Sequence, residues 1–272
     1  MGIFDFLKRS NGNDDSASPA IEHEENWAAY LSTIDDGAVG SIVVDLGLHQ
    51  VAPVAGLTEL LIIEIPMHRA AENGLPADGE FEVLADIEES FQSTLGEAIK
   101  CVFAGHLHCE GATNLYFFIE KGIELGDLLE RSIQTFKGYS FSYRLKPDPD
   151  WEAYFDFMYP SPIQIQRLGN ESVIRNLLEH GDNLEKKRKV EHWIYFASEA
   201  NRSQFLSAVA EEGYTVEGLS VEKDYELPYK AQISREDKVT LDATDEYILD
   251  LWQMAKDSNG KYDGWETFIV KN

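Results

Sequence analysis

LTELLIIEI, residues 57–65, is a nearly continuous apolar run, and the order of elements that it starts decides the fold of the first half of the chain. A run of this kind is typical of a buried β-strand. The patterns that follow it are a helix over about 79–97, strands at 99–109 and 113–119, a helix that stops at Gly138, and a strand at 139–145. This β-α-β-β-α-β order predicts the ferredoxin-like arrangement.

The second half of the chain repeats this order after one extra helix. Asn170 is the expected N-cap of that helix, which ends at His180-Gly181. The later patterns are a strand at 190–197, a helix from Ser198 to Gly213, strands at 214–221 and 225–234, a helix that Asp242 or Thr244 caps, and a last strand at 261–270. The second half is therefore also expected to be ferredoxin-like.

Two further strands precede residue 57, at 26–34 and 40–48, and Asp35-Asp36-Gly37 between them is a hairpin signal. The fold class that we predict is α+β, with two ferredoxin-like domains and antiparallel sheets. The first of these domains has an added N-terminal β-hairpin.

Composition divides the chain into a flexible leader at 1–25, an α+β domain at 26–145, an aromatic and proline-rich linker at 146–166, and a second domain at 167–272. In the linker, prolines interrupt regular structure while Trp151, Phe155 and Met158 recur at helical spacing. This aromatic surface predicts either a docking element between the domains or an exposed patch for a partner.

The formal net charge is −26, of which residues 1–160 carry −19 and residues 161–272 carry −7. A field this negative repels phosphate backbones, so it argues against nonspecific nucleic-acid binding and suits solubility or a basic protein partner. No apolar run approaches the ~20 residues that a membrane span needs. Cys101 and Cys109 lie too far apart on one predicted strand to bond. With no signal peptide, they indicate a reducing cytoplasm.

The strand at 99–109 also carries two candidate metal ligands. In strict alternation its odd positions, including both cysteines, form an apolar face, and its even positions place His106 and His108 on a polar face. A His-x-His pair can bind a metal, so a metal-dependent enzyme in the first domain is one alternative. No third ligand has suggestive spacing, and we expect the two histidines to be solvated.

The sequence contains no catalytic signature. Asp86, Glu88 and Glu89 lie opposite the apolar stripe of the helix at 79–97, which predicts a solvated helix face. A glycine-rich phosphate loop, a nucleophile elbow and an HExxH motif are all absent from the sequence. We therefore expect no catalytic residue and no cofactor.

The one basic run of the sequence comprises Lys186, Lys187, Arg188 and Lys189. It precedes a strand in which Trp193 and Tyr195 share one face, while His192 and Phe196 share the other. Basic residues beside strand aromatics on a ferredoxin-like sheet are typical of single-stranded RNA binders, so an RNA-binding module is a second alternative. A solvated loop next to a core strand is the simpler interpretation.

The stretch KYDGWETFIV, residues 261–270, decides whether the last strand offers a contact surface. Asp263-Gly264 inside a strand predicts a bulge, which sets whether Trp265 projects with Tyr262 or against it. Trp265 either packs on the helix that carries Trp252 or forms a partly exposed anchor beside acidic neighbours. The candidate partner-binding residues are Tyr262, Asp263, Gly264, Trp265, Glu266 and His192.

Four elements of the second half occur in an order and at separations that point to a known family: LLEHGDNLE (177–185), VEH (190–192), GYTV (213–216) and YDGWETF (262–268). They resemble the ribonuclease E inhibitor B family, RraB, over about 167–272. The resemblance implies a ferredoxin-like, non-catalytic regulator that binds the arginine-rich part of ribonuclease E and alters RNA turnover. The first half, from NWAAYL (26–31) to the strand at 139–145, is similar to DUF 695, a domain of unknown function.

These features together predict a cytoplasmic, non-enzymatic regulator that binds a protein partner, either ribonuclease E or another basic protein. We expect neither membrane binding nor direct nucleic-acid binding. Residues 161–272 hold no counterpart of the acidic tail of the RraB family, and the charge of residues 1–160 is expected to supply that negative field.

Overall fold

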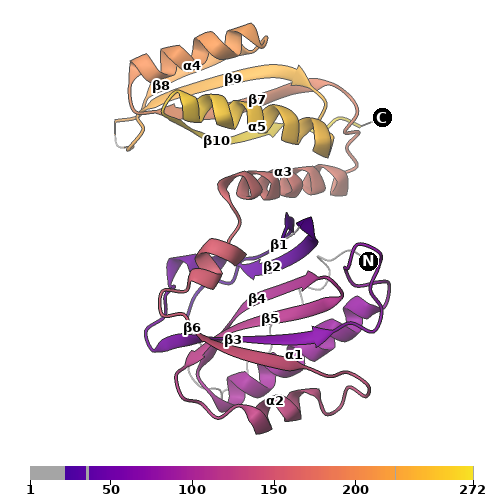
Figure 1. Ribbon diagram of the computed structural model, residues 1–272. Helices are drawn as coiled ribbons and strands as arrows, with labels where there is room; N and C mark the ends of the chain where they lie inside the picture. Colours follow the sequence, from indigo (N-terminus) through magenta and orange to yellow (C-terminus); the bar gives the residue numbers. More distant parts are fainter. Residues whose placement is uncertain (1–21, 35–36, 224, 272) are drawn as a thin grey trace. The chain divides into compact units, whose positions relative to one another are not determined.

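The computed structural model describes residues 22–34, 37–223 and 225–271, and the chain divides into two compact units, Met1–Pro160 (unit 1) and Ser161–Asn272 (unit 2) (Figure 1). Most of the predicted leader at 1–25 lies outside the described residues, as do Asp35 and Asp36 of the predicted turn. Within the described ranges, no helix is both long and apolar enough to cross a membrane.

Unit 1 is built on a six-stranded antiparallel sheet with the order β1-β2-β4-β5-β3-β6. Its elements are β1 (Trp27–Thr33), β2 (Val39–Asp45), the 3-10 helix η3 (Leu46–Gln50), β3 (Leu57–Pro66), α1 (Glu80–Ala98), β4 (Cys101–Cys109), β5 (Ala112–Glu120), α2 (Gly126–Ile133), β6 (Ser142–Pro147) and the short π-helical segment η4 (Ala153–Met158). The order β4-β5-β3-β6 is the ferredoxin-like one, and the hairpin β1–β2 extends the sheet at β4. The predicted fold of this unit is therefore confirmed.

Both faces of the unit 1 sheet are covered. Helices α1 and α2 contribute to the core on one face, and residues 151–159 contribute to the core on the other. Trp151 is fully buried, its ring stacks on Phe118 with centroids 3.8 Å apart, and its Nε1 donates a hydrogen bond to the Leu57 carbonyl (2.9 Å). Residues 151–159, for which the sequence left a docking element and an exposed patch open, thus form a layer of the core of unit 1.

A bulge in β4 changes which side chains share a face. The pairing register of β4 shifts between Phe103 and Gly105, and Gly105 has a φ of +141°. A Cβ at Gly105 would lie 2.0 Å from the Val43 carbonyl oxygen, so only glycine fits there. As a result, Cys101 packs with the core on the α1 side, whereas Cys109 belongs to the core on the opposite face. The prediction that both thiols lie on one face is wrong, because the bulge breaks the alternation.

Unit 2 has a four-stranded antiparallel sheet with the order β10-β7-β9-β8, which is again the ferredoxin-like order. Its elements are α3 (Pro162–Glu179), β7 (Arg188–Phe196), α4 (Glu199–Glu211), β8 (Thr215–Val221), β9 (Tyr229–Asp237), α5 (Leu241–Asp257) and β10 (Gly260–Thr267). One core joins the three helices to the inner face of this sheet. Figure 1 shows α4 and α5 on the same side of the strands.

Helix α3 begins eight residues before the predicted cap at Asn170. Ser161 is the N-cap, and its reciprocal hydrogen bonds with Gln164 form a capping box. Pro162 occupies the first turn, where a missing N–H leaves no hydrogen bond unmade. The prediction for Asn170 is wrong, because this proline starts the helix rather than interrupting it.

Candidate functional site

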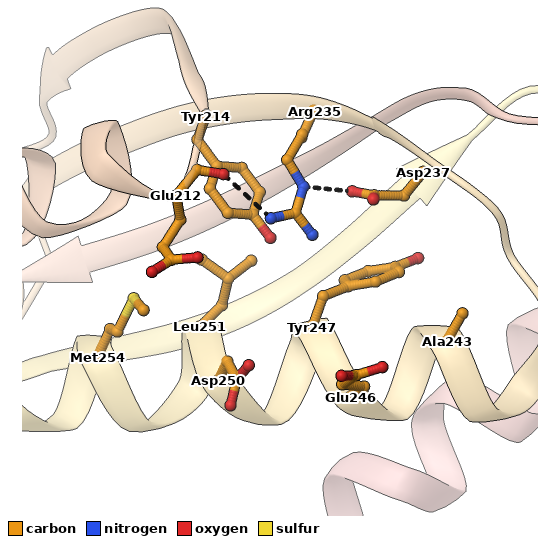
Figure 2. Close-up of a pocket in the computed structure, with 10 residues that line it drawn as sticks. All are labelled: Glu212, Tyr214, Arg235, Asp237, Ala243, Glu246, Tyr247, Asp250, Leu251 and Met254. Carbon is orange, nitrogen blue, oxygen red and sulfur yellow. Dashed lines mark hydrogen bonds and ion pairs between the residues drawn. The ribbon is translucent and has the colours of Figure 1, made fainter.

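Unit 2 contains a cleft of about 280 Å³ on the helical side of its sheet. Its wall on one side comes from the turn between α4 and β8 and from the end of β9, and its opposite wall comes from α5 (Figure 2). The lining residues are Glu212, Tyr214, Arg235, Asp237, Ala243, Glu246, Tyr247, Asp250, Leu251 and Met254. Two tyrosines, one arginine and four carboxylates therefore meet in one place, beside three apolar side chains.

Arg235 is held in the cleft by contacts on three sides. Its Nε donates to Asp237 Oδ2 at 2.7 Å, and its Nη1 donates to the Glu212 carbonyl at 3.2 Å. The guanidinium carbon lies 4.3 Å from the centre of the Tyr214 ring and 5.8 Å from that of Tyr247. These distances are in the range of cation–π contacts, so the arginine is held in position by the fold itself.

The alternation along β9 explains why this arginine faces the helices. Ala231 and Ile233 are fully buried in the unit 2 core, and Arg235 is the next residue on the same face. At this end of the strand, the ring of Tyr214 covers the guanidinium in place of an aliphatic core. A long side chain with an apolar stem and a charged tip suits such a border position.

Electrostatically, the cleft is acidic. One guanidinium faces four carboxylates, and Asp237 is the one that pairs with it directly. In the part of the chain that the structure describes, no ion pair engages Glu246 or Asp250. Leu251 and Met254 add an apolar wall. This combination suits a cationic group on an aliphatic stem, such as the side chain of a lysine or an arginine.

A buried histidine packs against the two tyrosines that line the cleft. The ring of His192 lies edge-on to Tyr214 (5.7 Å) and to Tyr247 (5.9 Å), and its Nδ1 is hydrogen-bonded to the Tyr262 hydroxyl at 2.9 Å. Burial, and secondly the charge of Arg235, lowers the pKa of His192 to about 3. Burial likewise raises the pKa of Tyr247 to about 12. This layer is thus neutral around pH 7, and it supports the cleft by packing.

The two aromatic candidates of the last strand lie in the core. Trp265 is 9% exposed, and Tyr262 and His192 are buried as well, so the exposed aromatic anchor that the sequence left open is not present. Asp263 and Glu266 are exposed. A register shift between Tyr262 and Gly264 turns Tyr262 and Trp265 to the same, inner face. The two aromatic side chains of the stretch 261–267 therefore pack in the core of unit 2.

Trp265 ends a chain of hydrogen bonds that joins β10, α3 and α5. Its Nε1 donates to Asn170 Oδ1 at 3.0 Å, and Asn170 Nδ2 donates to Asp245 Oδ1 at 2.8 Å. Asn170 is fully buried and satisfied at both ends of its amide. The asparagine that the sequence analysis interpreted as a cap therefore ties three elements together within the core.

The basic run is divided by the start of β7. Arg188 is buried, forms an ion pair with Asp182, and donates to the carbonyls of Asn183 and Phe268. Lys189 is bridged by two glutamates of the open sheet face. The interpretation of residues 186–189 as a solvated loop is wrong for Arg188, because its side chain closes the end of unit 2. Trp193 and Tyr195 lie half-buried on the open face, as the alternation predicts.

The two histidines of β4 are buried, which corrects the prediction that they are solvated. The bulge turns them toward α1, where His106 pairs with Glu88 through Nδ1 and His108 is hydrogen-bonded to Thr113 Oγ1 at 2.9 Å. Burial, and secondly His106, lowers the pKa of His108 well below its ordinary value. Glu88 is therefore a core residue, whereas Asp86 and Glu89 are exposed as expected. Among the described residues, no three His, Cys, Asp or Glu side chains form a group that could hold a metal.

The sequence patterns did not identify the residues of the cleft as a site. Tyr214 was visible within GYTV and Tyr247 within the apolar spacing of its helix, but each pattern indicates only packing. Arg235 follows two buried residues at every second position of β9, and this alternation weakly indicates that its side chain faces the helices. Nothing in the sequence indicated that these three side chains meet.

Comparisons with known proteins divide the chain at the same place as the structure. Residues 25–159 match the model of a family of unknown function, DUF695, and residues 169–267 match the family described as regulator of ribonuclease activity B, RraB. The N-terminal half thus resembles DUF695 and the C-terminal half resembles RraB, as the sequence predicted. A crystal structure of an unknown protein from Galdieria sulphuraria matches at 10% identity with a TM-score of 0.22, covering 78% of this chain and 99% of that one. No curated protein gives a significant match.

Proposed function

We propose that this protein, whose C-terminal unit matches the RraB family, is a non-enzymatic regulator that acts in the cytoplasm by binding a basic protein partner. The proposed partner is ribonuclease E or another basic protein of RNA decay. The family match over residues 169–267 supports a regulator-type role. The observation that carries the choice of partner is the acidic cleft around Arg235.

The cleft suits a cationic side chain better than an anionic one. Glu212, Glu246 and Asp250 line it in addition to the Arg235–Asp237 pair, so negative charge is in excess. A cation that enters the cleft gains from this field, and its aliphatic stem can lie along Leu251 and Met254. An anion would have to approach all four carboxylates to reach the single guanidinium.

The alternative of RNA binding has less support from the same unit. Arg188 is used within the fold, and Lys189 is neutralised by Glu191 and Glu217. Another lysine on the open sheet face, Lys230, pairs with a glutamate as well. A surface whose cations are already paired offers little attraction to phosphates.

The first test is a tagged pull-down from native lysate at low and moderate salt, with mass spectrometry of the captured proteins. The test variant is Glu246→Gln with Asp250→Asn, which removes two charges from the cleft. The matched control is Asp263→Asn with Glu266→Gln, which removes two exposed charges from β10.

We expect wild type and the β10 control to capture a ribonuclease or its scaffold, and the cleft variant to lose it. Capture should weaken with salt, because a Debye length of ~10 Å at 0.1 M shortens the reach of the field. If the cleft variant captures the same proteins as wild type, or if capture is insensitive to salt, the proposal is wrong. Circular dichroism of all variants shows whether they are folded.

A further inference from the structure

Strand β8 forms one edge of the unit 2 sheet, and three aliphatic side chains are exposed along it. Val216 is 45% exposed, Leu219 is 51% exposed and Val221 is 50% exposed. They lie opposite Ile233, Ala231 and Tyr229 of β9, so they belong to the helix-facing side of the sheet. A half-exposed aliphatic row on an edge strand is an incomplete core that a further strand would extend.

The opposite edge of the same sheet is different. Strand β10 carries the exposed charged residues Lys261, Asp263 and Glu266, and its inner side chains Tyr262 and Trp265 are buried. Charges and a bulge on an edge discourage pairing with another chain. Strand β8 also has a bulge, at Glu217, but Gly218–Val221 beyond it pair regularly with β9. The backbone of these four residues is the regular part of the exposed edge.

The sequence that contains this edge strand is one of two acidic stretches of unit 2, since residues 236–250 also carry a net charge of −5. Residues 211–226 contain six Asp or Glu and one Lys, which is a net charge of −5, whereas residues 161–272 together carry −7. Glu217 lies on the open face of the sheet, because it contacts Ser234 and Lys189 there. Glu222, just after β8, also pairs with a lysine of that face. The two faces beside β8 therefore differ: one is aliphatic, and the other carries carboxylates that are paired with Lys189 and Lys230.

We propose that β8 accepts an extended segment of the basic partner as an added strand, with cationic residues at every second position and aliphatic residues between them. This inference rests on the proposed function and adds the mode of binding. In such a strand the aliphatic side chains continue the row of Val216, Leu219 and Val221, and the cationic ones lie beside Glu217. Backbone hydrogen bonds along the edge supply affinity, and the alternation supplies specificity.

The edge is continuous in sequence with the acidic cleft. Glu212 and Tyr214 line the cleft, and β8 begins at Thr215. A segment paired with β8 therefore passes next to the cleft at one end of the strand.

The test uses a synthetic peptide of about ten residues that alternates arginine and valine, since ~3.3 Å per residue makes it longer than the edge. Two control peptides have the same sequence and charge. One is N-methylated at every valine and the other at every arginine. The N–H groups of a strand alternate between its two sides, so pairing with β8 uses only one of these two sets. Binding to the full chain is measured by calorimetry, and hydrogen exchange reports protection of the β8 amides.

We expect the unmodified peptide to bind, one N-methylated peptide to bind at least about tenfold more weakly, and the other to retain binding. The amides of β8 should gain protection. If both N-methylated peptides bind like the unmodified one, strand addition is overturned while the proposed binding of a basic partner stands. If the unmodified peptide does not bind, strand addition is overturned, and the lysate capture decides separately whether the proposed function survives.

A pair of variants tests the aliphatic row. Leu219→Gln removes an aliphatic side chain from β8, and Leu178→Gln removes one of similar exposure, 55%, from α3. Both remove a similar exposed apolar area without a change in charge. We expect Leu219→Gln to weaken peptide binding about fivefold and Leu178→Gln to leave it unchanged. Equal effects of the two variants would contradict the proposal. A second contradicting result would be a wild type that is dimeric and a Leu219→Gln variant that is monomeric but binds the peptide normally. The edge would then pair with a second copy of this chain.

Discussion

The buried pair of His192 and Tyr262 makes unit 2 sensitive to acid, and the size of this effect follows from one pKa. His192 is fully buried, and its pKa lies at about 3 instead of the ordinary 6.5. Below about pH 6.5 the unfolded chain binds a proton at this histidine, whereas the folded chain does not. The folded state is therefore destabilised as the pH falls, by about 1.4 kcal/mol per pH unit.

The perturbation that isolates this effect is His192→Phe combined with Tyr262→Phe. The double change removes both partners of the 2.9 Å hydrogen bond, so no buried polar atom is left without its partner. Between about pH 6.5 and pH 4.5, wild type should lose about 2 to 3 kcal/mol more stability than the variant, because only wild type carries the depressed histidine. Carboxylates that titrate in this range are present in both chains and cancel in the difference.

Native-state hydrogen exchange of β7 peptides within the full chain measures the stability of unit 2 by itself, since β7 lies at the centre of its core. Exchange is followed at several pH values between about 4.5 and 7, with intrinsic rates corrected for pH. A single change, Tyr262→Phe, is the control, because it keeps the titrating ring. If wild type and the double variant lose stability in parallel on acidification, His192 takes up a proton in the folded state, and the reasoning from burial is refuted.

Three further predictions concern other residues of the two cores. Arg188→Ala should destabilise unit 2 by about 3 to 5 kcal/mol in urea titration, because a buried partner charge is left unpaired, whereas Lys187→Ala at an exposed position should change little. Gly105→Ala should destabilise unit 1 by several kcal/mol, seen as a lower melting temperature, because its Cβ would lie 2.0 Å from a backbone oxygen. Trp265→Phe should cost about 1 to 3 kcal/mol, because the amide oxygen of Asn170 loses its donor, and a double-mutant cycle with Asn170→Ala should show coupling between the two sites. An uncoupled cycle, or wild-type stability of the arginine or glycine variant, would contradict the corresponding contact.

The sequence was sufficient for the order of elements and therefore for the fold. Apolar runs at period two and stripes at helical spacing placed the six elements of each ferredoxin-like unit, and the order of strands in the sheet follows from that succession. Helix starts were less well predicted: the N-cap of α5 is Thr240 rather than Asp242 or Thr244, and α3 begins well before Asn170. Pro162 was counted as a break, but in the first turn of a helix proline costs no hydrogen bond.

The orientation of individual side chains could not be predicted, because bulges override alternation. In β4 the register shift near Gly105 turns His106 and His108 from the expected solvated face into contact with α1. In β10 the shift before Gly264 brings Tyr262 and Trp265 to one face. A glycine within a strand indicates that a bulge is possible, but tertiary packing decides whether it forms and where the phase changes.

Net charge could not locate a contact surface, because it reports a sum and not a position. Unit 1 carries −19, and its expected role as the source of the negative field stays a prediction, whereas the acidic cleft lies in unit 2, which carries −7. The basic side chains that reduce this sum are partly used within the fold, as the ion pair of Arg188 and the bridged Lys189 show. Short-range attraction depends on the charges within about 10 Å of the partner, so the unit with the smaller net charge can still present an acidic surface. In the binding mode that we propose, β8 and the cleft beside its first residue are the parts of unit 2 that a basic partner would contact.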